Sequence, residues 1–187
     1  MANRNTQGFG LVPAGTLGQT PATSGTGKYK IDAGYATTIF QGGAVSSSAG
    51  YIVEGQGTAD NPMIGVLNGI FFNAATTLKP TFQNHYVQVT PANSEDIDAF
   101  VFDNPQQQYV VATDATVAQS GFLETYDMNA SAGRTTTGRS SSTLDIGDTS
   151  ADAAAFRLLR SAEDPENDEN ASFRSVVVCL NLIELQS

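Results

Sequence analysis

The chain contains one histidine, His85, the side chain best suited to proton transfer near neutral pH. Nucleophilic catalysis by a serine or a cysteine needs such an imidazole beside the nucleophile, together with an orienting acid. His85 lies in the segment FQNHYVQVT, which is typical of a strand, and the sequence has no G-x-S-x-G nucleophile elbow. We therefore interpret His85 as a structural or interface residue, and we predict no catalytic residues and no enzyme activity.

Carboxylates are numerous enough to raise two further chemistries. Glycoside hydrolysis needs a pair of them, but with so many acids any pair is compatible with chance, and the lack of tryptophan disfavours a groove that stacks sugars. The acidic run EDPENDEN (163–170) lacks the calcium-loop pattern and its turn glycine, and LDIGDTSAD (144–152) is interpreted in the same way. We predict no metal site and no cofactor. The acids from which a glycosidase pair could be drawn are Glu95, Asp96, Asp98, Asp103, Asp114 and Glu124.

Charge and composition exclude other classes of function. The chain has 9 basic and 19 acidic residues, a net charge of -10, so its surface repels phosphate backbones and we expect no direct nucleic-acid partner. Arg134 and Arg139 are the nearest approach to a basic patch. The glycine-rich GFGLVPAG follows no strand and is interrupted by Pro13, which argues against a phosphate loop. A single cysteine, Cys179, excludes an intrachain disulfide. The sequence shows neither a signal peptide nor a long apolar run, so we expect no membrane span and synthesis in a cytoplasm.

Short strand-like segments bounded by turn residues recur along the chain, whereas helical patterns are poor. The segment AAFRLLR alternates as a strand does, with Phe156, Leu158 and Arg160 on one face, although its composition also suits a helix. The pattern predicts an all-β protein, an antiparallel β-sandwich or barrel of the jelly-roll kind. The expected strands are 28–32, 37–40, 51–55, 63–72, 85–90, 98–103, 108–113, 122–128 and 172–185, in addition to FRLLR (156–160).

Two hairpins are predicted. Asn104 and Pro105 separate two apolar runs in DAFVFDNPQQQYVVATD, as a tight turn requires. The second hairpin joins FRLLR to the final strand, 172–185, which at about 3.3 Å per residue would extend roughly 45 Å. Because VVVCL is apolar on both faces, this strand is expected to be central or to contact another subunit. We predict an oligomer interface at Val176, Val178, Leu180 and Leu182.

The first 27 residues have few apolar side chains and much glycine and threonine. Fixing the backbone costs about 1–2 kcal/mol per residue, whereas a buried apolar side chain returns roughly 1.5–3 kcal/mol. The segment therefore needs a partner to become ordered. We predict an extended arm over 1–27 and a β body over 28–187. The arm's partner-binding anchors are expected to be Phe9, Leu11, Val12 and Pro13.

The order of several motifs resembles a family of tailed-bacteriophage virion proteins. These motifs are Phe9-Gly10-Leu11-Val12-Pro13, the strand Tyr29 to Ile31, Ala36 to Val45, NPMIGVLNGIFF, and TTGRSSSTLDIGD followed by FRLLRSAEDPENDEN. The resemblance covers most of the chain. Two departures are Gly42-Gly43 in place of a Gly-Asp turn and the acidic lengthening of the last hairpin.

The resemblance implies a capsid decoration or cement protein on the outside of the phage head. Its partner would be the major capsid protein. The protein would act as a homotrimer that clamps neighbouring subunits of that capsid protein together. Its location would be the virion, after synthesis in the host cytoplasm. The alternative is a virion fibre component or a carbohydrate-binding jelly-roll module that recognises the host surface.

Overall fold

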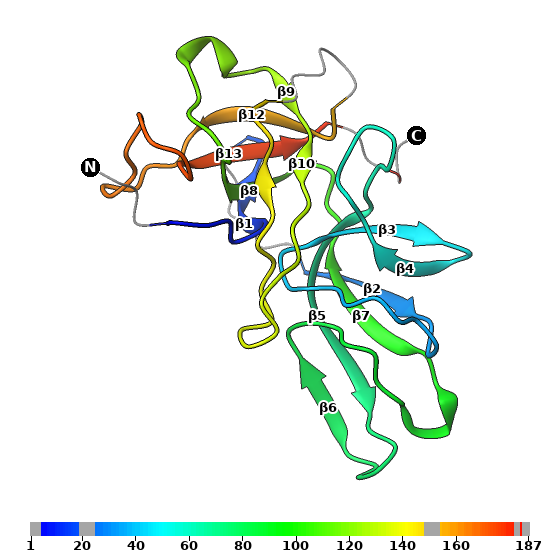
Figure 1. The fold of residues 1–187 in the computed structure, drawn as a ribbon. Coiled ribbons are helices and arrows are strands. Elements are labelled where there is room, and N and C mark those ends of the chain that lie inside the picture. The colour runs from blue at the N-terminus through cyan, green and yellow to red at the C-terminus, as the bar shows by residue number, and fades with distance from the viewer. Residues whose placement is uncertain (1–4, 19–24, 148–153, 182–183, 185–187) are drawn as a thin grey trace.

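The computed structural model describes residues 5–18, 25–147, 154–181 and 184. Regular structure in these residues consists of thirteen strands and two 3-10 turns, η1 (Ala92–Ser94) and η2 (Gln119–Gly121). The pairings between the named strands are antiparallel. The predicted all-β antiparallel fold is confirmed. Figure 1 shows two main sheets, one forming the upper part of the molecule and the other the lower part.

The upper sheet, called the open sheet, has β13 in its centre. This position explains why VVVCL is apolar on both faces, and the expected central strand is confirmed. The hairpin of β12 with β13 is also confirmed, because Phe156 lies opposite Leu180 and Ser161 opposite Val176. In spatial order the sheet contains β1 (Val12–Thr16), β8 (Gln107–Ala112), β13 (Ser175–Leu180), β12 (Phe156–Ser161) and β9 (Thr125–Tyr126).

The lower sheet, called the curled sheet, closes partly on itself. Its first and last strands in spatial order, β2 and β4, lie against each other, so the sheet wraps around its own apolar interior. The order is β2 (Gly27–Ile31), β7 (Ile97–Phe102), β5 (Gly65–Asn73), β3 (Ala44–Ser48) and β4 (Tyr51–Glu54), and β6 (Pro80–Gln83) pairs with β5. A small separate pair contains β10 (Met128–Asn129) and β11 (Thr143–Leu144).

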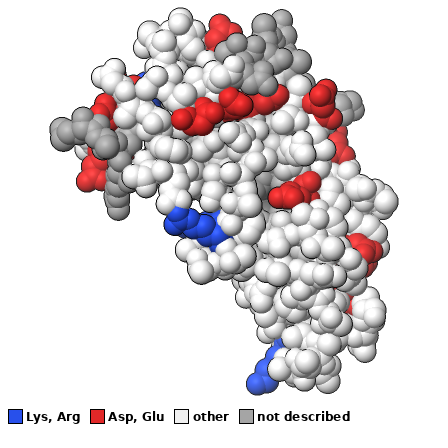
Figure 2. Space-filling model, viewed as in Figure 1, with Lys and Arg blue, Asp and Glu red and all other residues white. Residues whose placement is uncertain are grey.

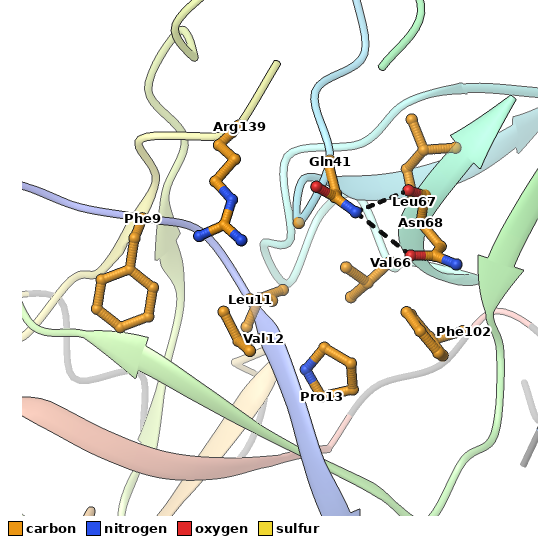
Figure 3. Close-up of a pocket in the computed structure, with 11 residues that line it drawn as sticks. Phe9, Leu11, Val12, Pro13, Gln41, Val66, Leu67, Asn68, Phe102 and Arg139 are labelled. Atoms are coloured by element: carbon orange, nitrogen blue, oxygen red, sulfur yellow. Dashed lines mark hydrogen bonds between the residues drawn. The ribbon is translucent and has the colours of Figure 1, made fainter. Parts of the chain in front are cut away.

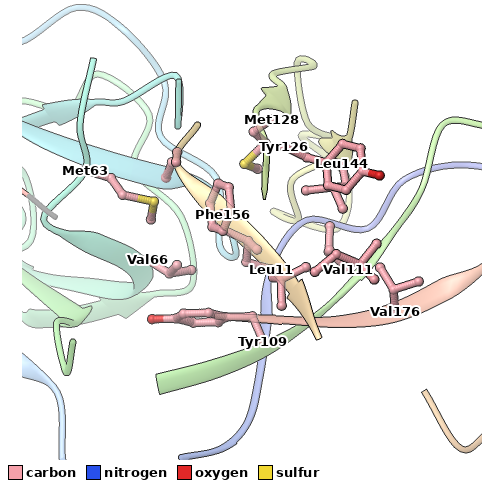
Figure 4. Packing of buried hydrophobic residues seen from close by; sticks show 14 of the residues in the cluster. Leu11, Met63, Val66, Tyr109, Val111, Tyr126, Met128, Leu144, Phe156 and Val176 are labelled. Atoms are coloured by element: carbon pink, nitrogen blue, oxygen red, sulfur yellow. The ribbon is translucent and has the colours of Figure 1, made fainter. Parts of the chain in front are cut away.

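Two clusters of buried apolar side chains hold the sheets. Core 1 lies on the inner face of the open sheet and also receives Ala44, Met63 and Val66 from the curled sheet and the loop before it (Figure 4). Core 2 fills the curled sheet. The remaining members of core 1 are Leu11, Tyr109, Val111, Val117, Tyr126, Met128, Leu144, Ala155, Phe156, Leu158, Val176 and Val178. Core 2 consists of Ile31, Ile39, Val45, Ile52, Ile64, Leu67, Ile70, Phe72, Tyr86, Ile97, Ala99 and Val101.

The N-terminal segment differs from its prediction. Within the described part of 1–27, Val12–Thr16 forms β1 and pairs with β8, and Leu11 is only 2% exposed inside core 1. This part therefore belongs to the body and does not extend away from it. Backbone pairing with β8 supplies the stabilisation that the sparse apolar content could not, and composition alone does not reveal such pairing. Residues 1–4 and 19–24 lie outside the described residues.

The predicted hairpin around Asn104 and Pro105 is wrong. The turn exists, since the Gln106 N–H donates to Asn104 Oδ1 at 2.9 Å and the Gln107 N–H donates to the Asn104 carbonyl at 3.0 Å. However, β7 continues into the curled sheet and β8 into the open sheet. A tight turn reverses the chain locally but does not decide which strand each run pairs with. Here each run faces a different core.

Four further predicted strands differ from the structure. Residues 122–128 do not form one strand, because β9 (Thr125–Tyr126) and β10 (Met128–Asn129) belong to different sheets. The segments 37–40 and 85–90 form no described strand; instead Ile39 and Tyr86 make an isolated bridge, with mutual backbone hydrogen bonds of 3.0 and 2.8 Å. The final strand covers six residues, not 172–185. Phe173 has a φ of 59°, in the left-handed region, and this conformation interrupts an extended backbone just before β13.

Candidate functional site

A groove of about 220 Å³ lies where the N-terminal segment passes the curled sheet (Figure 3). All four residues predicted as anchors line it. The structure therefore brings these residues together, but as one wall of a groove within the body. The groove is lined by Phe9, Leu11, Val12, Pro13, Gln41, Gly42, Val66, Leu67, Asn68, Phe102 and Arg139.

The wall formed by the N-terminal segment is fixed through its backbone. The Gly10 N–H donates to the Ser142 carbonyl at 3.1 Å, and the Leu11 N–H donates to the Gly42 carbonyl at 2.8 Å. Gly10 has a φ of 73°, and a Cβ at this position would come within 2.7 Å of the Gly42 carbonyl oxygen. Only glycine fits here without strain. The turn at Gly10 sends Leu11 into core 1 and leaves Phe9, Val12 and Pro13 at the groove.

The opposite wall is built by an irregularity in β5. The pairing of β5 with β7 shifts register between Leu67 and Gly69, so Asn68 is the extra residue of a β-bulge. The Gln41 side-chain amide donates to the Asn68 carbonyl at 3.0 Å and to Asn68 Oδ1 at 3.4 Å (Figure 3). These contacts place two amide groups beside the apolar floor formed by Val66 and Phe102.

The third side of the groove is Arg139, which belongs to the tongue, residues 130–142 between β10 and β11. The tongue lies against the loop before β3, because the Gln41 N–H donates to the Gly138 carbonyl and the Ser140 N–H to the Gln41 carbonyl, both at 2.9 Å. Within the described part of the chain, the Arg139 guanidinium has neither a hydrogen bond nor an ion pair. It is therefore available to an external carboxylate.

A second cavity, of about 290 Å³, adjoins the groove and shares Phe9 and Arg139 with it. It also contains Arg134, so the two arginines of the tongue flank one continuous depression. Figure 2 shows a basic patch on a face that otherwise carries mostly acidic and uncharged side chains. The sequence indicates the two arginines but not the bulge or the amides that line the groove with Arg139, because these groups are brought together by strand register.

The predicted oligomer interface remains a prediction, but two of its four residues have a role within one chain. Val176 and Val178 are fully buried in core 1, and Leu180 packs against that core. Val176 and Val178 are therefore not available to a neighbouring subunit, whereas Leu180 is only partly buried. Leu182 lies outside the described residues. Val176 and Val178 are buried because β8 and β12 flank β13 in the open sheet and residues of the curled sheet pack on the same core.

The remaining polar candidates have structural environments. The His85 ring stacks on Phe40 with centroids 5.9 Å apart, and its Nδ1 lies 2.8 Å from Asn84 Oδ1. The acidic loop 163–170 is held by Asn167, whose side chain bonds both the N–H and the carbonyl of Ser175 at 2.9 and 2.8 Å. Among the described residues, no group of three or more His, Cys, Asp or Glu side chains is placed to hold a metal ion.

Three comparisons with known proteins, against family models, curated proteins and solved structures, find no match to this chain. In the described residues, no helix has the length and apolar character needed to cross a membrane. The fold and the groove thus define an all-β protein with a groove of about 220 Å³ between its N-terminal segment and the curled sheet.

Proposed function

We propose that the protein decorates the outside of a bacteriophage capsid and docks through the groove onto an extended segment of the major capsid protein. The observation that carries this proposal is the preformed groove itself, in which an apolar floor adjoins two amides and an unpaired guanidinium. Its volume of about 220 Å³ lies below the roughly 300–1,000 Å³ typical of small-molecule sites. A groove of this size suits one apolar side chain, with a nearby carboxylate on Arg139.

The order of motifs that resembles phage virion proteins supports the class of function. The groove itself also supports it, because a groove that exists before binding loses little conformational entropy when a peptide binds. Several copies acting together, as in the homotrimer implied by the resemblance, would bind neighbouring capsid subunits at once. Modest individual contacts then add through effective concentration. With β13 buried, such a trimer would have to assemble through other surfaces.

Binding to purified capsids tests the proposal. Val12 is 41% exposed and lines the groove, whereas Leu17, at 43% exposed, lies outside it. We expect Val12→Asp to lower occupancy on the particles at least tenfold, and Leu17→Asp to leave it unchanged. Arg139→Glu should likewise reduce occupancy, with Arg160→Glu on the open sheet as the charge-matched control. Equal occupancy for all four variants would contradict the proposal.

A second candidate function is recognition of a host-surface carbohydrate. The aromatic side chains Phe71, Phe82 and Phe100, on the outer face of the curled sheet, favour this function.

A further inference from the structure

A row of four side chains crosses the outer face of the curled sheet. In the strand register, Phe82 of β6 lies opposite Phe71 of β5, Phe71 lies opposite Asp98 of β7, and Asp98 lies opposite Lys30 of β2. Side chains opposite each other on paired strands project from the same face of a sheet. Two aromatic rings, a carboxylate and an ammonium group therefore stand side by side, although they come from four separate parts of the sequence.

The aromatic end of this row is broad and open to solvent. Phe82 is 63% exposed, and its ring lies 5.7 Å from that of Phe100, measured between centroids, at 36°. The ring covers Gly69, where a Cβ would come within 2.8 Å of the Gln83 carbonyl oxygen and 3.2 Å of the Phe82 ring. The lack of a side chain at Gly69 lets Phe82 lie across the sheet. Phe71, Phe82 and Phe100 together form an aromatic surface.

The polar end of the row borders a cavity of about 310 Å³. Asp98 pairs there with Lys28 at 2.7 Å and with Lys30 at 2.6 Å, and the Tyr51 hydroxyl donates to Asp96 at 3.2 Å. The cavity therefore offers hydrogen-bond acceptors and donors beside an aromatic ring. It is lined by Lys30, Phe71, Phe72, Asn73, Pro91, Glu95, Asp96 and Asp98.

We infer that this face binds a neutral oligosaccharide, with one sugar in the cavity against Phe71 and the next along the Phe82–Phe100 surface. A pyranose ring has an apolar face of C–H groups and a rim of hydroxyls that both donate and accept hydrogen bonds. The rings of the three phenylalanines match the first feature. The carboxylates of Asp96 and Asp98, with the Asn73 amide, match the second.

The charges of the cavity disfavour single-stranded nucleic acid, another ligand that stacks on aromatic surfaces. Single-stranded nucleic acid also stacks on exposed rings, but its sites line the backbone with positive charge. Here Glu95, Asp96 and Asp98 outnumber the one lysine that lines the cavity, so a phosphate backbone is repelled. A neutral ligand avoids that repulsion.

This inference rests on the second candidate function, host-surface recognition, and does not depend on capsid docking through the groove. The two fail separately, because one is measured with purified protein and soluble sugars and the other with capsids. A variant of the sheet face should keep full occupancy on capsids, and a variant of the groove should keep sugar binding.

The test is binding of wild-type protein and variants to an array of neutral oligosaccharides of hexoses and N-acetylhexosamines, followed by titration calorimetry with the best binder. We expect Phe82→Ala and Phe71→Ala to weaken binding at least tenfold. Phe82→Tyr should retain it, because the ring remains. Leu123→Ala, which truncates a side chain of nearly equal exposure (62%) on the other side of the fold, should leave binding unchanged.

Because Phe82 also covers Gly69, each variant is first checked for an unchanged thermal unfolding midpoint, and Asp96→Asn probes the polar end without altering the aromatic packing. It should weaken binding without lowering stability by more than Leu123→Ala does. Wild-type signals on the array no higher than those of Phe71→Ala would overturn the inference. Preferential binding of a thymidine dodecamer that weakens steeply with added salt would also overturn it, in favour of nucleic acid.

Discussion

Leu11 fixes the N-terminal segment to the body because its side chain lies inside core 1 while its neighbours line the groove. Its N–H is also bonded to the Gly42 carbonyl at 2.8 Å. The residue thus joins two tasks. It contributes to the stability of the fold, and it sets the position of Phe9, Val12 and Pro13 at the groove.

Replacing Leu11 with alanine should lower the free energy of unfolding by about 2–5 kcal/mol, the usual range for a buried leucine. Val12→Ala shortens the exposed side chain of the next residue and should change the free energy of unfolding by no more than about 0.5 kcal/mol. Urea denaturation followed by circular dichroism measures both values. If the Leu11→Ala variant were as stable as the wild type, the N-terminal segment would not belong to the body and would be an arm instead.

The ion pairs of Asp98 make the stability of the fold depend on pH. Burial alone raises the pKa of this carboxyl, but hydrogen bonds from Lys28 and Lys30 outweigh burial and hold the pKa below its ordinary value. The unfolded value is about 3.9. The ionised group therefore stabilises the fold above that pH, and this stabilisation is lost as the pH falls through the folded pKa.

We expect Asp98→Asn to be less stable than the wild type at pH 7, and the difference between them to shrink as the pH falls below about 3.9. Urea midpoints measured between pH 7 and pH 2.5 give the comparison. Asp60→Asn, at an exposed position, is the control and should keep a constant offset from the wild type. A gap that stayed constant for Asp98→Asn would show that its ion pairs do not stabilise the fold.

At the scale of elements, β13 is the strand on which the open sheet depends. It pairs with β8 on one side and β12 on the other, and Val176 and Val178 point into core 1. Cys179, on the opposite face, is also buried, and burial raises the pKa of its thiol. A change on this strand therefore affects folding before it affects association.

The variant Val178→Asp should yield no folded protein, because it places an unpaired charge in core 1. Val178→Ala should still fold, with reduced stability. Circular dichroism and gel filtration distinguish the two variants. A well-folded Val178→Asp protein whose only defect was a smaller assembly would restore this strand as a subunit interface.

The approximate positions of most strands could be read from the sequence, whereas strand partners could be read in only one of two cases. The alternation in FRLLR predicted β12, and its hairpin with β13 followed from the intervening turn residues. The same reasoning failed at Asn104 and Pro105, since a turn signal is local and the choice of partner depends on which core each strand enters. For the site, the sequence indicated Phe9, Leu11, Val12 and Pro13. The bulge at Asn68, which faces them, follows from register and leaves no clear trace in composition.

At the scale of the whole molecule, the two sheets share core 1. Met63 and Val66 belong to the curled sheet and the residues leading into it, yet both pack against side chains of the open sheet. The crossover from β7 to β8 is held in the same region, where the Tyr109 hydroxyl donates to the Phe102 carbonyl at 3.1 Å. Loss of one sheet therefore exposes apolar surface of the other.

We expect the protein to unfold in one cooperative transition despite its two cores. Scanning calorimetry should give a calorimetric enthalpy equal to the van't Hoff enthalpy. Tyrosine absorbance and far-ultraviolet circular dichroism should report the same midpoint. Two resolved transitions would mean that contacts between Val66 and the open sheet contribute little to stability.

The pairing of Lys28 and Lys30 with Asp98 has a practical consequence for conjugation chemistry. The chain contains only three lysines, and the third, Lys79, is exposed in the β5–β6 turn at the end of the same sheet. Side-chain attachment of an amine-reactive dye or biotin is therefore confined to the curled sheet. Coupling at Lys28 or Lys30 places the label beside Phe100 and Asp98 on the outer face of the curled sheet, so the choice of coupling chemistry decides whether an assay can detect the aromatic surface.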